Sequence, residues 1–159
     1  RGGRRGPGRL LAGRRGGLLL VTPRDHWPPL DGGLAMEPLG VDARTGARTF
    51  SYTWSPGYRA TQAAFERCQG AHDPNAIAHL LHRAPYHVDS LLVMYDLYRH
   101  MGENSHAEEV LGRALYALEG AWHPQFDARS GSCRLDYDRP ENRALYGALW
   151  RHAQALSRA

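Results

Sequence analysis

Apolar residues recur at intervals of three and four positions from Tyr58 almost to the end of the chain. This period places one apolar stripe along a helix, whereas the side chains of a strand alternate every two residues. Glycines, prolines and N-capping residues divide the pattern into separate segments. The spacing predicts five amphipathic helices, over about residues 58–70, 74–84, 89–101, 105–118 and 140–156.

Two of these helices have recognisable starts. Asp73 precedes Pro74, which is the arrangement of an N-cap followed by proline at the first helical position. Ser105 is followed three residues later by Glu108, which predicts a capping box for the fourth helix.

Five helices joined by short turns favour an antiparallel array. The third and fourth also carry the residue spacing of a tetratricopeptide unit, at Tyr98, Gly102, Ala107, Leu111 and Ala114. The predicted fold is therefore all-α, with antiparallel helix pairs in a tetratricopeptide-like α-solenoid. Such a stack needs further repeats to cover its last apolar face, so we expect the chain to be the front portion of a longer solenoid.

The residues before the helices have a different composition. Residues 1–17 contain six arginines, seven glycines and no acidic residue, which predicts a disordered tail. Residues 18–56 are apolar in short bursts and broken by proline and glycine, which predicts an extended arm with little regular structure. Alternation within the arm allows two short strands, at Leu18–Val21 and Arg48–Trp54. Residues 57–159 then form the helical-repeat domain.

Charge is concentrated at the start of the chain. All 20 basic residues are arginine; residues 1–60 hold ten of them against four acids, and residues 61–159 hold ten against twelve acids. The tail is therefore either a solvated segment or a flexible contact for RNA phosphates. The candidate RNA or ribosome contacts are Arg1, Arg4, Arg5, Arg9, Arg14 and Arg15.

We find no residue set typical of catalysis, of a metal site or of a cofactor site. His79 and His82 lie three apart, but no second ligand pair accompanies them. The adjacent Glu108 and Glu109 are expected on a solvated outer face. Phosphate-binding glycine motifs are absent from the sequence. We therefore expect no cofactor and no enzymatic activity.

The two cysteines, Cys68 and Cys133, give neither a disulfide framework nor a paired zinc motif. They are interpreted as reduced thiols of a cytosolic or nuclear protein. The apolar run Leu18–Val21 is too short for a membrane span, so no membrane partner is expected.

Three stretches carry a family resemblance. They are DPNAIAHLLHRAPYHVDSLL (73–92), RALYALEGAWHPQF (113–126) and SGSCRLDYDRPENRALYGAL (130–149). Together they closely resemble the family of transcription factor 25, also called nuclear localised protein 1, whose yeast relative is subunit 1 of the ribosome quality control complex. Residues 19–39 and 50–66 resemble the segments that precede this helical domain.

The resemblance implies a non-catalytic adaptor in ribosome-associated quality control, found in the cytosol and the nucleus. Its implied partners are a listerin-type E3 ubiquitin ligase, ubiquitin, the large ribosomal subunit and a p97-type ATPase. In this role it would promote ubiquitination and extraction of stalled nascent chains. A nuclear transcriptional regulator, acting as a repressor, is the alternative. The resemblance also implies a long acidic and lysine-rich N-terminal region, and we interpret the arginine-rich start of this sequence as a remnant of it.

Two polar segments within these motifs have two open interpretations. Pro85, Tyr86, His87 and Asp89 form either a helix-to-helix corner or part of a partner-binding groove. The second segment forms either an internal salt-bridged network or the other part of that groove. Its members are Arg134, Asp136, Tyr137, Arg139, Pro140, Glu141 and Asn142.

Overall fold

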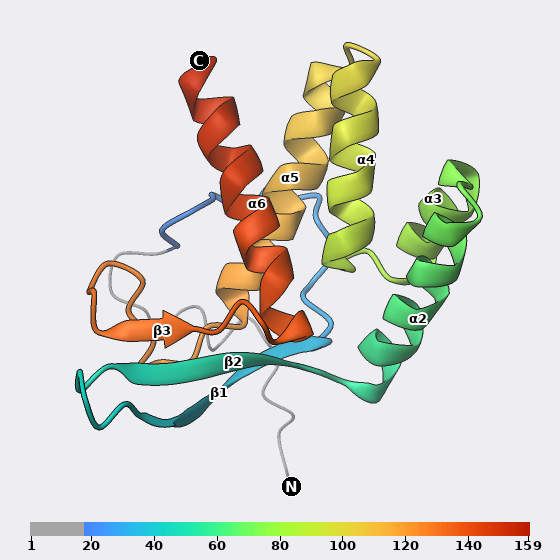
Figure 1. The fold of residues 1–159 in the computed structure, drawn as a ribbon. Helices are drawn as coiled ribbons and strands as arrows, with labels where there is room; N and C mark the ends of the chain where they lie inside the picture. The colour runs from blue at the N-terminus through green and yellow to red at the C-terminus, as the bar shows by residue number, and fades with distance from the viewer. Residues whose placement is uncertain (1–17) are drawn as a thin grey trace, which may run out of the picture.

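The structure is a computed structural model that describes residues 18–159. Across these residues the chain forms five helices and a small three-stranded sheet (Figure 1). The predicted disordered tail, residues 1–17, lies outside the described residues.

The sheet joins segments that lie far apart in the chain. Strands β1 (Leu34–Val41) and β2 (Arg48–Trp54) form an antiparallel hairpin. Strand β3 (Cys133–Leu135) pairs parallel to the first three residues of β2, which makes β2 the central strand. The prediction of an all-α fold is therefore wrong, and the segment expected to be an irregular arm supplies two of the three strands.

Most of this sheet could not be predicted from the sequence, and the structure shows why. Strand β1 contains Pro38 and Gly40, and the pairing register shifts between them. Proline is tolerated there because β1 is an edge strand, which needs no ladder hydrogen bond on its outer side. The alternation at Arg48–Trp54 correctly indicated β2, but Leu18–Val21 is not a strand.

The helices lie close to where the apolar period placed them. They are α2 (Pro56–Gly70), α3 (Pro74–Arg83), α4 (Val88–His100), α5 (Asn104–Gly120) and α6 (Pro140–Ser157). The predicted cap at Asp73 is confirmed, since its side chain accepts from the backbone N–H of Ala76 at 3.2 Å. The capping box at Ser105 is wrong: α5 begins at Asn104, and no side chain caps it.

Helices α4 and α5 form the antiparallel pair that the tetratricopeptide spacing indicated. Gly102 makes the turn between them with φ at +75°, a conformation that glycine adopts without steric cost. Ala107 and Ala114 are buried and allow close approach of the two helices.

The elements around the α4–α5 pair do not form a solenoid. Helix α6 packs against α5, α4 and strand β2, and its first turn lies over the sheet (Figure 1). The position where a solenoid would stack another helix pair is thus occupied by one helix and a sheet. The predicted α-solenoid is corrected accordingly to a helical array on a small mixed sheet.

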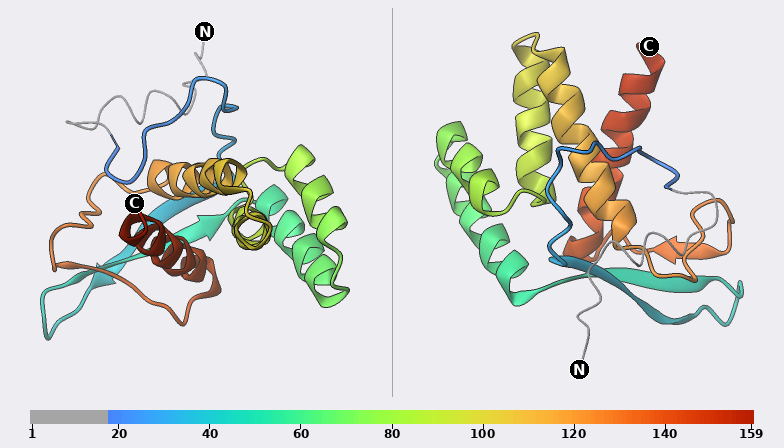
Figure 2. Two further views of the ribbon diagram at one scale, coloured as in Figure 1. Left: turned by 90° about the horizontal axis from the view of Figure 1, so that it is seen from above. Right: turned by 180° about the vertical axis from the view of Figure 1, so that it is seen from behind.

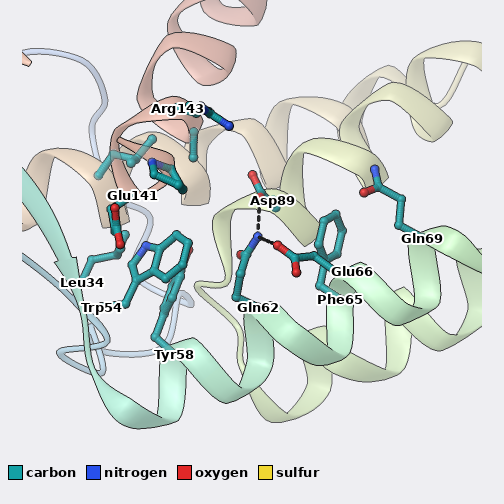
Figure 3. Close-up of a pocket in the computed structure, with 13 residues that line it drawn as sticks. Leu34, Trp54, Tyr58, Gln62, Phe65, Glu66, Gln69, Asp89, Glu141 and Arg143 are labelled. Atoms are coloured by element: carbon teal, nitrogen blue, oxygen red, sulfur yellow. Dashed lines mark hydrogen bonds between the residues drawn. The ribbon is translucent and has the colours of Figure 1, made fainter. Parts of the chain in front are cut away.

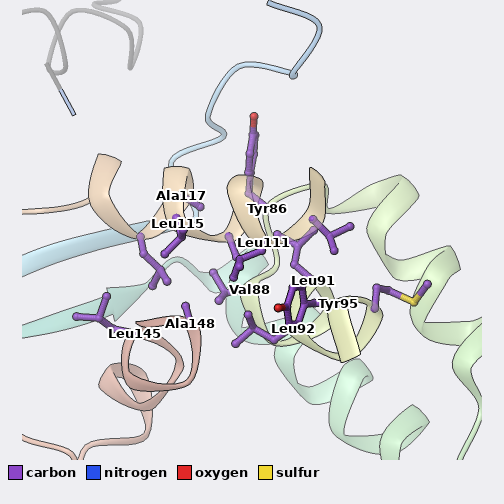
Figure 4. Close-up of a cluster of buried hydrophobic side chains, with 14 of the residues drawn as sticks. Tyr86, Val88, Leu91, Leu92, Tyr95, Leu111, Leu115, Ala117, Leu145 and Ala148 are labelled. Carbon is purple, nitrogen blue, oxygen red and sulfur yellow. The ribbon is translucent and has the colours of Figure 1, made fainter. Parts of the chain in front are cut away.

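The core lies where α4, α5 and α6 meet. Leu91 of α4, Leu118 of α5 and Ala148 of α6 are each no more than 1% exposed. Figure 4 shows side chains from the three helices pointing toward one another. The sheet adds Phe50 and Tyr52 of β2, which are equally buried, so β2 is a structural part of the core.

Residues 18–33, here called the strap, cross α5 on the side away from α6 (Figure 2). Near its start, the buried carboxylate of Glu119 accepts the backbone N–H groups of Leu19 and Leu20 at 2.5 and 2.6 Å. The strap also inserts Trp27 against Gly112, where a Cβ atom would lie 2.9 Å from the indole ring. Glycine therefore makes room for the strap on this face of α5.

A second glutamate of α5 holds the middle of the strap. Glu109 accepts from Arg24 and Trp27, both at 2.7 Å, and its other contact is with His26 at 2.6 Å. Partial burial raises the pKa of Glu109, but the hydrogen bonds from His26 and Trp27 outweigh it and the pKa is lowered. The expectation that Glu109 lies on a solvated face is wrong, because the strap covers it.

Candidate functional site

The first predicted segment is the corner between α3 and α4, and much of it is buried. Tyr86 is 2% exposed and donates its hydroxyl to the carbonyl of Pro28 in the strap. Burial raises the pKa of Tyr86 to about 12. The guanidinium of Arg113 lies 5.8 Å from the Tyr86 ring and donates to the carbonyl of Pro85. Through these hydrogen bonds, this part of the corner connects the α3–α4 turn to α5 and to the strap.

His87 connects the buried corner to the surface. The predicted helix start is confirmed, because the His87 Nδ1 atom accepts the backbone N–H of Ser90 at 3.3 Å. An N–H can only donate, so the proton of the neutral ring sits on Nε2 and is donated to Gln62 Oε1 at 2.7 Å. Burial lowers the pKa of His87 to about 4, so the ring is uncharged at neutral pH.

Gln62 carries this hydrogen-bond chain outward. Its amide nitrogen donates to Asp89 Oδ2 at 2.8 Å and to Glu66 Oε1 at 3.4 Å. Gln62 itself is 7% exposed, so it is a buried polar residue on the helix face that also presents Tyr58 and Phe65. Its amide fixes the direction of two carboxylates at the molecular surface.

The second predicted segment joins β3 to the start of α6. Asn142 is fully buried, accepts the backbone N–H of Tyr52 at 2.8 Å, and donates to the carbonyl of Asp136 at 2.9 Å. It therefore ties β2 to the β3–α6 loop. Arg134 and Arg139 are exposed, and among the described residues their guanidinium groups form no ion pair with the acids of this segment.

Within this loop, Tyr137 forms an exposed aromatic contact. Its ring lies 5.4 Å from that of Tyr146, and the guanidinium of Arg143 lies 5.5 Å from its centroid. Arg143 also donates to the carbonyls of Tyr137 and Asp138, at 3.0 and 3.2 Å. Two of the three guanidinium nitrogens of Arg143 thus donate to the loop.

The two predicted segments meet at one cleft of about 200 Å³ (Figure 3). Asp89 from the first segment and Pro140 and Glu141 from the second both line it. The remaining lining residues come from both strands of the hairpin and from helices α2, α5 and α6: Leu34, Trp54, Tyr58, Gln62, Phe65, Glu66, Gln69, Leu118, Arg143 and Ala144. Tyr86, Asn142 and the exposed Arg134, Asp136, Tyr137 and Arg139 do not line it.

Sequence reasoning missed the part of this cleft that comes from β2 and α2. Trp54, Gln62 and Glu66 were not among the predicted site residues, although the sequence contains a signal for Gln62. Gln62 sits between Tyr58 and Phe65 at helical spacing, so a polar residue was placed on an apolar face. A buried polar side chain needs a hydrogen-bond partner. One partner of Gln62 is Asp89, which lines the cleft.

The described residues show neither a metal-binding cluster nor a membrane-spanning helix. Within residues 18–159, no group of three or more histidine, cysteine or acidic side chains is arranged to hold a metal ion. Nor does this part of the chain contain a helix long and apolar enough to cross a bilayer.

Comparison with known proteins identifies the family. A family model described as "Transcriptional repressor TCF25" matches residues 50–159. The chain belongs to the TCF25 family. The resemblance inferred from the three sequence stretches above is thereby confirmed, and the matched range covers the whole candidate site except Leu34 of β1.

Individual relatives agree with this assignment. The human protein named "Ribosome quality control complex subunit TCF25" is 40% identical over 140 residues, which cover 87% of this chain and 20% of the human protein. "Ribosome quality control complex subunit 1" of Schizosaccharomyces pombe is 35% identical over 144 residues, covering 90% of this chain and 22% of that protein. "Probable transcription factor claV" of Ampulloclitocybe clavipes is 32% identical over 123 residues, or 77% of this chain and 16% of that protein.

The chain thus spans about a fifth of the length of the human and Schizosaccharomyces pombe relatives. No solved structure matches it.

Proposed function

We propose that this chain is part of a non-catalytic adaptor of the ribosome-associated quality control complex. The observation that carries the proposal is its kinship, over most of its length, with proteins named as subunits of that complex. The candidate site of the described residues is a cleft lined by several helices and strands, which suits contact with a segment of a partner.

In this role the chain promotes ubiquitination and extraction of stalled nascent chains on the large ribosomal subunit. Its proposed partners are a listerin-type E3 ubiquitin ligase, ubiquitin, the large subunit and a p97-type ATPase, and its proposed locations are the cytosol and the nucleus. The cleft and the exposed β3–α6 loop beside it are the proposed contact surface, since both polar segments singled out in the sequence reach the surface there.

Ribosome co-sedimentation tests the adaptor role. The chain, with and without residues 1–17, is mixed with large subunits carrying stalled nascent chains and sedimented across a salt series. We expect both forms to sediment at low salt. The tail arginines (Arg1, Arg4, Arg5, Arg9, Arg14 and Arg15) are proposed RNA contacts, so the full chain should bind more tightly and show a steeper salt dependence. Absence of both forms from the large-subunit fraction at low salt would contradict the proposal.

A pull-down with the listerin-type ligase tests the contact surface. Arg134→Ala and Arg139→Ala are suitable variants, because both side chains are exposed and their removal breaks no hydrogen bond or ion pair within the described residues. We expect weaker ligase capture by the variants, and unchanged capture by Arg83→Ala on α3 as the matched control. Undiminished capture by both folded variants would remove this loop from the proposed surface.

A transcriptional regulator in the nucleus is the second candidate. It is favoured by the description of the family as a transcriptional repressor and by the kinship with claV. This function predicts DNA association that is lost when residues 1–17 are removed. An electrophoretic mobility assay with the full and shortened chains tests it, and equal migration of DNA with either chain would count against it.

A further inference from the structure

The cleft where the two predicted polar segments meet carries unbalanced negative charge. Its lining includes the carboxylates of Glu66 on α2, Asp89 on α4 and Glu141 on α6. None of the three forms an ion pair within the described residues, where the only ion pairs are those of Glu109 and Asp96.

The other polar groups near these carboxylates do not balance all three negative charges. Arg143 lines the cleft, but its Nε and Nη2 atoms donate to loop carbonyls, and its guanidinium faces the Tyr137 ring. His87 lies behind the cleft as a neutral ring that donates to Gln62. Three carboxylates against the one guanidinium of Arg143 leave the lining with a net charge of −2, which can attract a cationic ligand.

Aromatic side chains form the wall next to these carboxylates. Trp54 and Tyr58 lie 5.8 Å apart between ring centroids, and both line the cleft (Figure 3). The exposed guanidinium of Arg59, which is not a lining residue, already lies 5.6 Å from the Trp54 centroid. The indole thus accepts an arginine within this same chain, as expected for a cation beside an aromatic ring.

We propose that the cleft binds an arginine side chain from a basic segment of a partner protein. Arginine suits the site better than lysine because its planar group stacks on an aromatic ring and bonds a carboxylate in bidentate fashion. The Gln62 amide holds two of the carboxylates in place before the ligand arrives, which reduces the entropy lost on binding. RNA is a poor occupant, because its phosphates carry the same sign as the lining.

This inference deepens the proposed adaptor function and depends on it only for which protein supplies the arginine. Its test therefore uses a synthetic probe and no ribosome. A heptapeptide of glycine and serine with one central arginine is titrated into the full chain, with the indole N–H signal of Trp54 followed by NMR. Peptides with lysine or the neutral isostere citrulline at the central position serve as comparisons. We expect the affinity order arginine, lysine, citrulline, and a shift of the Trp54 signal that saturates.

Three variants sharpen the test. Glu66→Gln combined with Asp89→Asn should weaken arginine binding about fivefold, from roughly 0.5 kcal/mol per exposed charge pair. Glu141→Gln alone should weaken it less, and this side chain accepts no hydrogen bond, so the variant should fold even if the double variant does not. Glu108→Gln, an exposed acid outside the cleft, is the control and should leave binding unchanged.

Equal binding of the citrulline and arginine peptides would overturn the proposal. So would undiminished binding in folded Glu141→Gln, or equal weakening by Glu108→Gln, which would indicate general attraction to an acidic surface. If the peptide binds only after residues 1–17 are removed, the occupant is the chain's own tail and the partner proposal fails. None of these results depends on co-sedimentation with ribosomes, so failure of the adaptor role is recognised separately.

Discussion

Replacing Glu119 with glutamine tests whether the strap stabilises the folded chain. The Glu119 carboxylate is 1% exposed and accepts two backbone N–H groups of the strap, at 2.5 and 2.6 Å. Glutamine keeps the size of the side chain but presents an NH₂ group to one of these donors. One charged hydrogen bond, which contributes about 1.5–3 kcal/mol, is then lost, and two donors face each other.

The expected loss of unfolding free energy is therefore about 2–3 kcal/mol. For a chain of this length, each kcal/mol lowers the midpoint of thermal unfolding by roughly 3 °C, so the variant should melt roughly 5–10 °C below the parent. Circular dichroism of the helices gives the midpoint. Limited digestion with trypsin gives an independent reading, since Arg24 in a loosened strap should be cut sooner.

Glu108→Gln is the matched control for this experiment. It makes the same charge change on the same helix, at an exposed side chain that accepts no hydrogen bond. Its melting temperature should differ from the parent by little. If Glu119→Gln melts together with Glu108→Gln, the two strap hydrogen bonds add nothing to stability, and the assignment of the strap as part of the folded unit is refuted.

Three further changes test other parts of the structure. Asn142→Ala should lower the unfolding free energy in urea by about 2–3 kcal/mol, because the buried N–H of Tyr52 is left without its acceptor, and a loss below about 0.5 kcal/mol would contradict this. Gly102→Ala forces a left-handed φ on alanine and should cost about 1–2 kcal/mol, whereas Gly70→Ala, in open space at ordinary φ, should be neutral or stabilising in the same titration. Because burial lowers the pKa of His87 from 6.5 to about 4, the unfolded chain binds the proton first on acidification, and the unfolding free energy should fall by about 2 kcal/mol between pH 7 and pH 5. His87→Gln should lose this part of the pH slope, and an unchanged slope would be evidence against the buried neutral ring.

The helices were predictable because each carries its own signal. An apolar stripe with a start such as Asp73–Pro74 depends only on neighbouring residues, and all five predicted helices are present. The sheet was not predictable as a whole, because its pairing depends on residues distant in sequence. Strand β1 contains a proline, and β3 has three residues inside a loop, so neither shows a clear period.

The same distinction applies to the candidate site. The sequence selected Asp89 and Glu141 as candidate site residues, and the structure places both at one cleft. It could not select Trp54, whose role depends on where β2 meets α2. A salt-bridged network was one of the two interpretations of the segment around Arg134, and no ion pair of this segment is found among residues 18–159. Charge spacing in a loop does not reveal that a neutral residue, Asn142, connects the loop to the sheet.

The parallel pairing of β2 with β3 has a consequence for the order in which this chain can fold. Arg48 pairs with Cys133, and four helices lie between them in the chain. During synthesis the hairpin and these helices emerge first, while one edge of β2 stays open until β3 arrives. Closing so long a loop costs entropy before any contact compensates for it, so completion of the sheet is expected to be the slow step. Until then an unpaired strand edge is exposed, and binding by a chaperone at that stage would protect it from pairing with other chains.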